Sequence, residues 1–67
     1  MSNSRILVIG ACGQVGTELV ENLADKFGRD RVIASDIRDE ANFDVPYLRL
    51  DVLDRNGVRQ AVIDHEI

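Results

Sequence analysis

The chain has 67 residues, of which twelve are acidic and eight are basic, so its net charge is −4. The basic residues are scattered, which argues against a surface suited to nucleic-acid phosphates or to an anionic membrane. The single cysteine and single histidine predict neither an internal disulfide nor a metal site. An unpartnered cysteine suits a reducing compartment, so we expect a cytoplasmic protein.

The length is small for what the sequence contains. A domain of about 60 residues buries only about 60% of the surface that its unfolded chain exposes, and such folds usually need disulfides or a metal. Yet 45% of the residues are hydrophobic and 30% are charged, the balance of an ordinary globular domain. We therefore expect residues 1–67 to be a fragment, the N-terminal part of a larger domain.

A strand and a helix are expected first. Residues 6–9 form a continuous aliphatic run, which predicts a strand buried on both faces, as in a parallel sheet covered by helices. An apolar series spaced four residues apart then predicts a helix that ends at Gly28, since glycine readily adopts helix-ending conformations. The expected apolar face of this helix consists of Val15, Leu19, Leu23 and Phe27, with Val20 and Ala24 beside it.

Two further strands are expected. The second covers residues 31–35 and stops at Asp36, and the polar stretch 36–46 with the only proline predicts a loop. Residues 47–52 alternate between apolar and polar side chains, which is typical of a half-exposed strand at the edge of a sheet.

A second helix should follow the third strand. Asp54 can cap its start by accepting from the first free N–H groups. Gly57 in the first turn should weaken the helix by about 1 kcal/mol relative to alanine. The helix is expected to run to about Glu66 and to bury Val58, Ala61 and Val62.

The order strand–helix–strand–strand–helix predicts an α/β fold, namely the N-terminal part of a Rossmann-like doubly wound parallel sheet. In the strand order 3-2-1-4-5-6 the first strand is central and the third lies at an edge, as the two burial patterns require. The chain stops at Ile67, where the fourth strand would begin. The first strand would then keep an open apolar edge, so we expect these residues alone to be poorly folded or associated.

The glycines between the first strand and the helix predict a phosphate site. Gly10, Gly13 and Gly16 form G-x-x-G-x-x-G, which differs from G-x-G-x-x-G in its first spacing. Glycines in such a turn allow the sharp change of direction, the approach of a pyrophosphate and close helix packing. The helix N-terminus adds free N–H groups and a positive dipole end. The alternative is a plain turn with incidental glycines.

Asp36 is the second predicted binding residue. It ends the second strand, 20 residues after Gly16, where a carboxylate is expected to accept from the ribose hydroxyls of adenosine. A carboxylate there repels a 2′-phosphate, which favours NAD over NADP. Arg38 favours the opposite choice, because a nearby arginine can accommodate that phosphate. Asp36 could instead cap a turn.

Asp51 and Val52 end the third expected strand on the same side of the sheet. The carboxylate could accept from the adenine amino group, and Val52 could lie along the ring. An exposed edge aspartate in water explains Asp51 equally well. Cys12 is expected to be a small residue tolerated in the turn, and His65 to be structural.

Three segments, "ILVIGACGQVGTELV", "VIASDIR" and "LDVLDR", resemble the extended short-chain dehydrogenase/reductase superfamily, and most closely its short-chain-type L-threonine 3-dehydrogenases. The resemblance implies NAD as cofactor, oxidation of L-threonine to 2-amino-3-ketobutyrate, and a homodimer. It also implies ten cofactor-binding residues: Gly10, Gly13, Gln14 and Val15 at the pyrophosphate, Gly16 for helix packing, Asp36, Ile37 and Arg38 at the adenosine, and Asp51 and Val52 at the adenine.

The catalytic residues of that family have no match here. The family uses a Tyr-x-x-x-Lys pair with a serine or threonine, whereas Tyr47 is followed four residues later by Asp51 and the only lysine is Lys26. We assign no catalytic residue and expect this chain alone to be inactive. A nucleotide-sugar epimerase or dehydratase, or a non-catalytic module that senses dinucleotide redox state, would share the same features.

Overall fold

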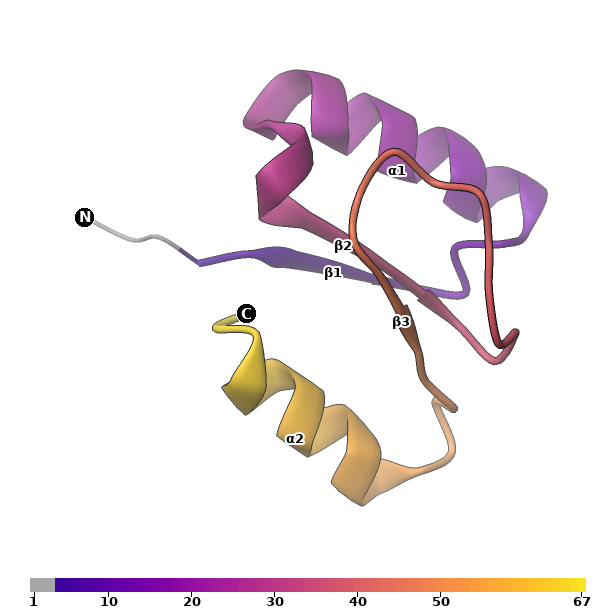
Figure 1. Ribbon diagram of the computed structural model, residues 1–67, viewed down its shortest axis with the longest axis vertical. Helices are drawn as coiled ribbons and strands as arrows, with labels where there is room; N and C mark the ends of the chain where they lie inside the picture. Colours follow the sequence, from indigo (N-terminus) through magenta and orange to yellow (C-terminus); the bar gives the residue numbers. More distant parts are fainter. Residues whose placement is uncertain (1–3) are drawn as a thin grey trace.

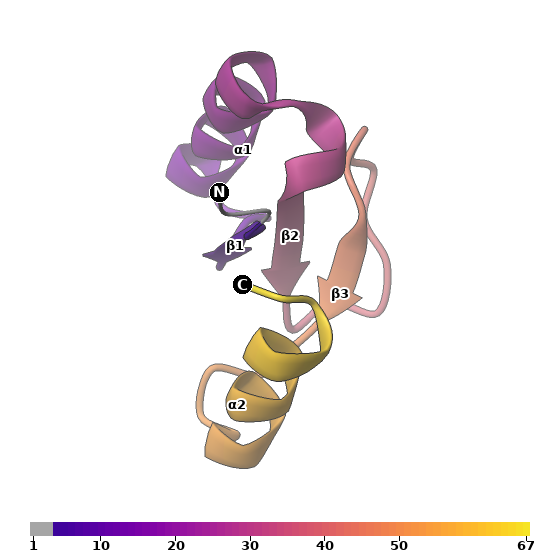
Figure 2. The ribbon, with the colours of Figure 1, turned by 90° about the vertical axis from the view of Figure 1, so that its left-hand side faces the viewer.

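The computed structural model describes residues 4–67. In chain order the elements are β1 (Ile6–Ile9), α1 (Gln14–Phe27), the short 3-10 helix η1 (Arg29–Arg31), β2 (Val32–Asp36), β3 (Tyr47–Arg49) and α2 (Arg55–Asp64). Helix α1 lies along one side of the sheet and α2 lies on the other side (Figures 1 and 2). The molecule therefore has the helix–sheet–helix layers expected for this α/β class.

The sheet is parallel and has the order β1-β2-β3, which confirms the predicted topology. Strand β2 is central, and its first four residues are all buried. Strand β1 lies at an edge of the sheet within residues 4–67, which confirms the open edge expected for the first strand. The expectation that both faces of this strand are buried is wrong, because only Val8 is buried and Ile9 is 42% exposed.

The core lies between α1 and the sheet. Opposed residues of neighbouring strands, such as Val8 and Ala34, share this face of the sheet. Leu23, Phe43 and Tyr47 pack around the cluster. The buried cluster consists of Val8, Ala11, Val20, Ala24, Val32, Ala34 and Val45.

The face of α1 that packs on the sheet is offset by one residue from the predicted face. Val20 and Ala24 are buried, whereas Val15 is 79% exposed and Leu19 is 45% exposed. The cause is Gly16, where an added Cβ would lie 2.4 Å from the carbonyl oxygen of Gly10. Because the backbone approaches so closely at Gly16, residues 16, 20 and 24 face the sheet. Residues 15 and 19 then lie at the side of the helix, away from the core. Phe27, expected in the same face, is also largely exposed.

The second half of the chain keeps the predicted order with different bounds. Strand β2 begins one residue later than expected because Arg31 belongs to η1, and it includes Asp36. Strand β3 ends at Arg49, not at residue 52. The next residues turn instead: the N–H of Asp54 donates to the carbonyl of Asp51 over 2.9 Å.

Helix α2 is capped as predicted. The Asp54 carboxylate accepts from the N–H of Gly57 over 3.0 Å. The helix ends at Asp64, and of the three apolar residues expected inside only Ala61 is buried. Val58 is half-buried and Val62 is 39% exposed, because no further layer within residues 4–67 covers the outer side of α2.

The close contact at Gly16 gives a direct test of the packing. We expect Gly16→Ala to lower the free energy of unfolding by about 1–3 kcal/mol, since its Cβ meets backbone atoms that cannot rotate away. Gly13→Ala is the matched control, because its Cβ would have no neighbour nearer than 3.7 Å. Urea unfolding of both variants at the native length of the protein measures the difference. Equal losses of unfolding free energy in the two variants would contradict the explanation that Gly16 determines which face of α1 packs on the sheet.

Candidate functional site

The glycine turn after β1 is fixed to the end of β2. The carbonyl oxygen of Ser35 accepts from the N–H groups of both Gly10 and Ala11, each over 2.9 Å. Gly10 has a φ of +79°, a conformation that L side chains rarely adopt. The buried hydroxyl of Ser35 donates to the carbonyl of Val8 over 2.8 Å. Ser35 therefore holds both the end of β1 and the start of the turn.

The turn leads directly into the first turn of α1. Thr17 donates its N–H to the carbonyl of Gly13 over 2.9 Å. Its hydroxyl lies 3.0 Å from the carbonyl oxygen of Ala11 and 2.8 Å from that of Gly13, so it can donate to either. Gly13 is the N-cap and provides no side-chain cap. The exposed first turn, which begins with Gln14 and Val15, therefore presents N–H groups and a positive dipole end to an anion.

Asp36 links the end of β2 to the glycine turn. Its Oδ2 accepts from the N–H of Cys12 over 2.9 Å, and its Oδ1 accepts from the N–H of Ile37 over 2.7 Å. These two backbone hydrogen bonds, that of Cys12 first, lower the pKa of Asp36 below its ordinary value. Asp36 is therefore a fixed carboxylate next to the turn, with lone pairs left for a further donor.

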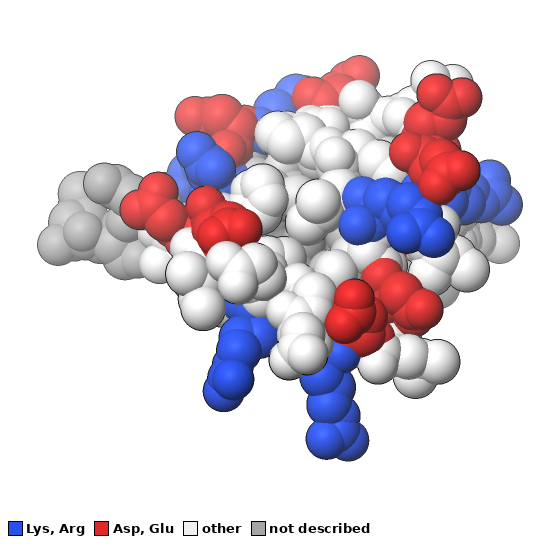
Figure 3. Space-filling view, turned by 60° about the horizontal axis from the view of Figure 1, so that its bottom comes forward, with Lys and Arg blue, Asp and Glu red and all other residues white. Residues whose placement is uncertain are grey.

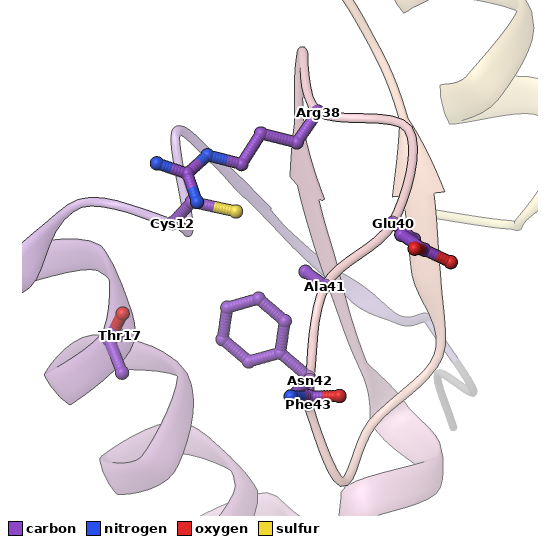
Figure 4. A pocket seen from close by; sticks show the side chains of 7 residues that line it. All are labelled: Cys12, Thr17, Arg38, Glu40, Ala41, Asn42 and Phe43. Atoms are coloured by element: carbon purple, nitrogen blue, oxygen red, sulfur yellow. The ribbon is translucent and has the colours of Figure 1, made fainter.

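An open hollow of about 520 Å³ lies between the start of α1 and the loop after β2 (Figure 4). Figure 4 shows the Arg38 side chain reaching across this hollow toward Cys12, with the ring of Phe43 on the loop side. No pattern in the sequence predicted this hollow. The lining residues are Cys12, Thr17, Arg38, Glu40, Ala41, Asn42 and Phe43.

Eight of the ten predicted binding residues lie at one edge of the sheet, at the carboxyl ends of β1 and β2. They are Gly10, Gly13, Gln14, Val15 and Gly16 of the turn and first helical turn, and Asp36, Ile37 and Arg38 at the end of β2.

Asp51 and Val52 lie apart from this group, in the turn beyond β3. The Asp51 carboxylate accepts from the N–H of Leu53 over 2.9 Å, and Val52 is 57% exposed. No hydrogen bond joins either residue to the glycine turn within residues 4–67. Asp51 instead lines a second hollow, of about 320 Å³, between β3 and α2.

Residues 4–67 contain no group of three or more metal-binding side chains, and neither α-helix in this range is long and apolar enough to cross a membrane. Figure 3 shows acidic and basic side chains interspersed over one face, without a broad basic patch there.

No family model matches the chain. A human protein named inactive L-threonine 3-dehydrogenase, mitochondrial, is 39% identical over an aligned length of 66, and the match covers 94% of this chain and 29% of that protein. An uncharacterized epimerase/dehydratase of Staphylococcus aureus is 44% identical over an aligned length of 66, and the match covers 92% of this chain and 21% of that protein. The chain thus spans less than a third of the length of these relatives.

The solved structures that resemble this chain include proteins with names similar to those of these relatives. The GalE-like L-threonine dehydrogenase of Cupriavidus necator has a TM-score of 0.90 at 36% identity, over 94% of this chain and 21% of that one. The L-threonine dehydrogenase of Clostridium difficile has a TM-score of 0.86 at 30% identity, over 100% and 22%. In sequence and in fold, the chain is similar to a part of the L-threonine 3-dehydrogenases and epimerase/dehydratases of the extended short-chain dehydrogenase/reductase superfamily.

Proposed function

We propose that residues 1–67 are the NAD-binding N-terminal portion of an L-threonine 3-dehydrogenase, which oxidises L-threonine to 2-amino-3-ketobutyrate. One observation carries this proposal: a glycine turn at the start of α1 is held against a fixed carboxylate at the end of the neighbouring strand. Similarity to several solved L-threonine dehydrogenases supports the choice of reaction.

The residues of the turn suit a pyrophosphate. The proposal places it against the N–H groups of the first turn of α1, with Gly10, Gly13, Gln14 and Val15 around it. A Cβ at Gly13 would have no neighbour within 3.7 Å, so the surface beside this glycine is open to a ligand. Gly16 serves the packing of the helix. Bound NAD supplies the hydride acceptor of the reaction, and this chain supplies its orientation.

The end of β2 suits the adenosine. Each oxygen of the Asp36 carboxylate accepts one backbone N–H and can still accept a ribose hydroxyl. Its negative charge favours NAD over NADP, although Arg38 is close enough to influence that choice. Ile37, which is 60% exposed, could contact the base. We keep Asp51 and Val52 as proposed adenine contacts on the grounds of their position after β3.

Two other functions each have an observation in their favour. The Staphylococcus aureus relative is named an epimerase/dehydratase, which favours nucleotide-sugar chemistry on the same NAD-binding portion. The human relative is named inactive, which favours a non-catalytic dinucleotide sensor. The homodimer stays a prediction, and one similar solved structure is described as monomeric. A cytoplasmic location stays a prediction too, since the human relative is named mitochondrial.

Binding and activity measurements on the full-length protein distinguish these three functions. We expect NAD binding in isothermal titration calorimetry and NADH formation, read by absorbance, with L-threonine but not with UDP-sugars. Conversion of UDP-sugars would support the epimerase or dehydratase. NAD binding without turnover of either substrate would support the sensor, and absence of NAD binding would reject all three.

The role of Asp36 is tested by charge removal. We expect Asp36→Asn to raise the Kd for NAD about 10- to 100-fold, because hydrogen bonds to a charged group contribute about 1.5–3 kcal/mol. The gap between NAD and NADP affinity should narrow, since the repulsion of the 2′-phosphate is removed. Asp39→Asn is the matched control, as its carboxylate pairs with the exposed Arg49 over 2.9 Å. An equal loss of NAD affinity in both variants would reject the role.

Low pH should remove the contribution of the Asp36 carboxylate to the free energy of unfolding. The pKa of Asp36 in the folded protein lies below the ordinary value of 3.8, so its contribution is complete above that value and disappears as the pH falls through the lowered pKa. Wild type and Asp36→Asn should therefore differ in unfolding free energy at pH 7, begin to converge as the pH falls below 3.8, and meet only below the lowered pKa of Asp36. Urea unfolding at several pH values measures this, and a difference that persists in acid would contradict it.

A further inference from the structure

Tyr47 connects the core to the loop that lines the open hollow. It is the first residue of β3, opposite Ala34 of β2, and it is half-buried against the core cluster. Its ring stacks on that of Phe43, with a centroid separation of 6.1 Å and an interplanar angle of 13°. The hydroxyl donates to the carbonyl oxygen of Arg38 over 2.7 Å. A core side chain therefore holds the backbone of the loop at Arg38.

The surroundings of the Tyr47 hydroxyl keep it a donor. Partial burial, and after it the neighbouring Cys12 and the Asp36 carboxylate, raise the pKa of Tyr47 above its ordinary value. The phenol is therefore protonated throughout the physiological range. The same neighbours place the hydroxyl next to the glycine turn and the end of β2, although Tyr47 belongs to neither.

The Arg38 side chain depends on this backbone contact for its place. Figure 4 shows its guanidinium at the rim of the hollow, beside the side chain of Cys12. No carboxylate lies within ion-pair distance of the guanidinium in residues 4–67. After the backbone hydrogen bonds from Cys12 and Ile37, the charge of Arg38 also lowers the pKa of Asp36, so the guanidinium acts on that carboxylate. The position of the Arg38 backbone limits how closely the guanidinium can approach it.

We propose that Tyr47 is a positioning residue of the dinucleotide site: its hydroxyl fixes the backbone of Arg38 so that the guanidinium stands between the glycine turn and the end of β2, where the adenosine end of the dinucleotide binds. This inference rests on the proposed function. It gives the single tyrosine of the chain a role in cofactor binding and none in proton transfer.

A double-mutant cycle at the native length of the protein tests the inference. Tyr47→Phe keeps the ring, its stacking on Phe43 and its packing, and removes only the hydroxyl. Arg38→Ala removes the guanidinium and keeps the carbonyl that Tyr47 binds. We measure the Kd of NAD and of NADP for wild type, both single variants and the double variant by calorimetry, with thermal unfolding of each.

Tyr47→Phe should weaken NAD binding about three- to tenfold in the wild-type background, as expected for one lost hydrogen bond. The same substitution should change the Kd by less than about twofold when Arg38 is alanine, because it acts through the guanidinium. NADP should show the same dependence on background. Equal losses in both backgrounds would mean a merely structural role and would overturn the inference, as would no loss in wild type.

These measurements distinguish a failure of the proposed function from a failure of the proposed role of Tyr47. A wild-type protein that binds neither NAD nor NADP would reject the proposed function, and the role of Tyr47 with it. Wild-type binding without coupling between Tyr47 and Arg38 would reject the role of Tyr47 alone.

Discussion

The structure depends on one set of hydrogen bonds at the carboxyl ends of β1 and β2. The Ser35 carbonyl accepts from two consecutive N–H groups of the glycine turn, and the Asp36 carboxylate accepts from a third, that of Cys12. These bonds determine where the chain leaves the sheet and where α1 begins. Gly16 then allows α1 to lie close enough for Val20 and Ala24 to reach the core. The same backbone atoms thus serve folding and the proposed binding of a dinucleotide.

The sequence predicted the order of the elements, the parallel topology and the cap at Asp54, because each has a local signature in residue type and spacing. It did not predict which face of α1 packs on the sheet. The rows 15–19–23 and 16–20–24 are both compatible with a helix, and the first is the more apolar. The contact between Gly16 and the carbonyl of Gly10 decides between them, and this is a property of the folded backbone that hydrophobic periodicity does not contain.

The candidate site, too, has residues that the sequence predicted and contacts that it did not. The glycine spacing and the acidic end of the second strand marked the three glycines, Asp36 and Arg38 in advance. The resemblance to a known family implied Gln14, Val15 and Ile37. The N–H of Cys12 as partner of Asp36 was not predicted, since every residue except proline has such a donor. In the sequence, Tyr47 is only a tyrosine without the lysine of a Tyr-x-x-x-Lys pair, and its contact with Arg38 depends on the path of a loop without regular structure. The hollow at that loop was missed for the same reason.

The double acceptance by Ser35 also bears on the thermodynamics of binding. A loop that orders only around its ligand loses conformational entropy at that moment, and affinity is reduced accordingly. Here the hydrogen bonds of the turn and the positive φ of Gly10 are made by contacts within the chain itself. Its entropy is lost during folding, so little remains to be lost on association. The affinity for an anion at the first turn of α1 would then lose little to the ordering of this loop.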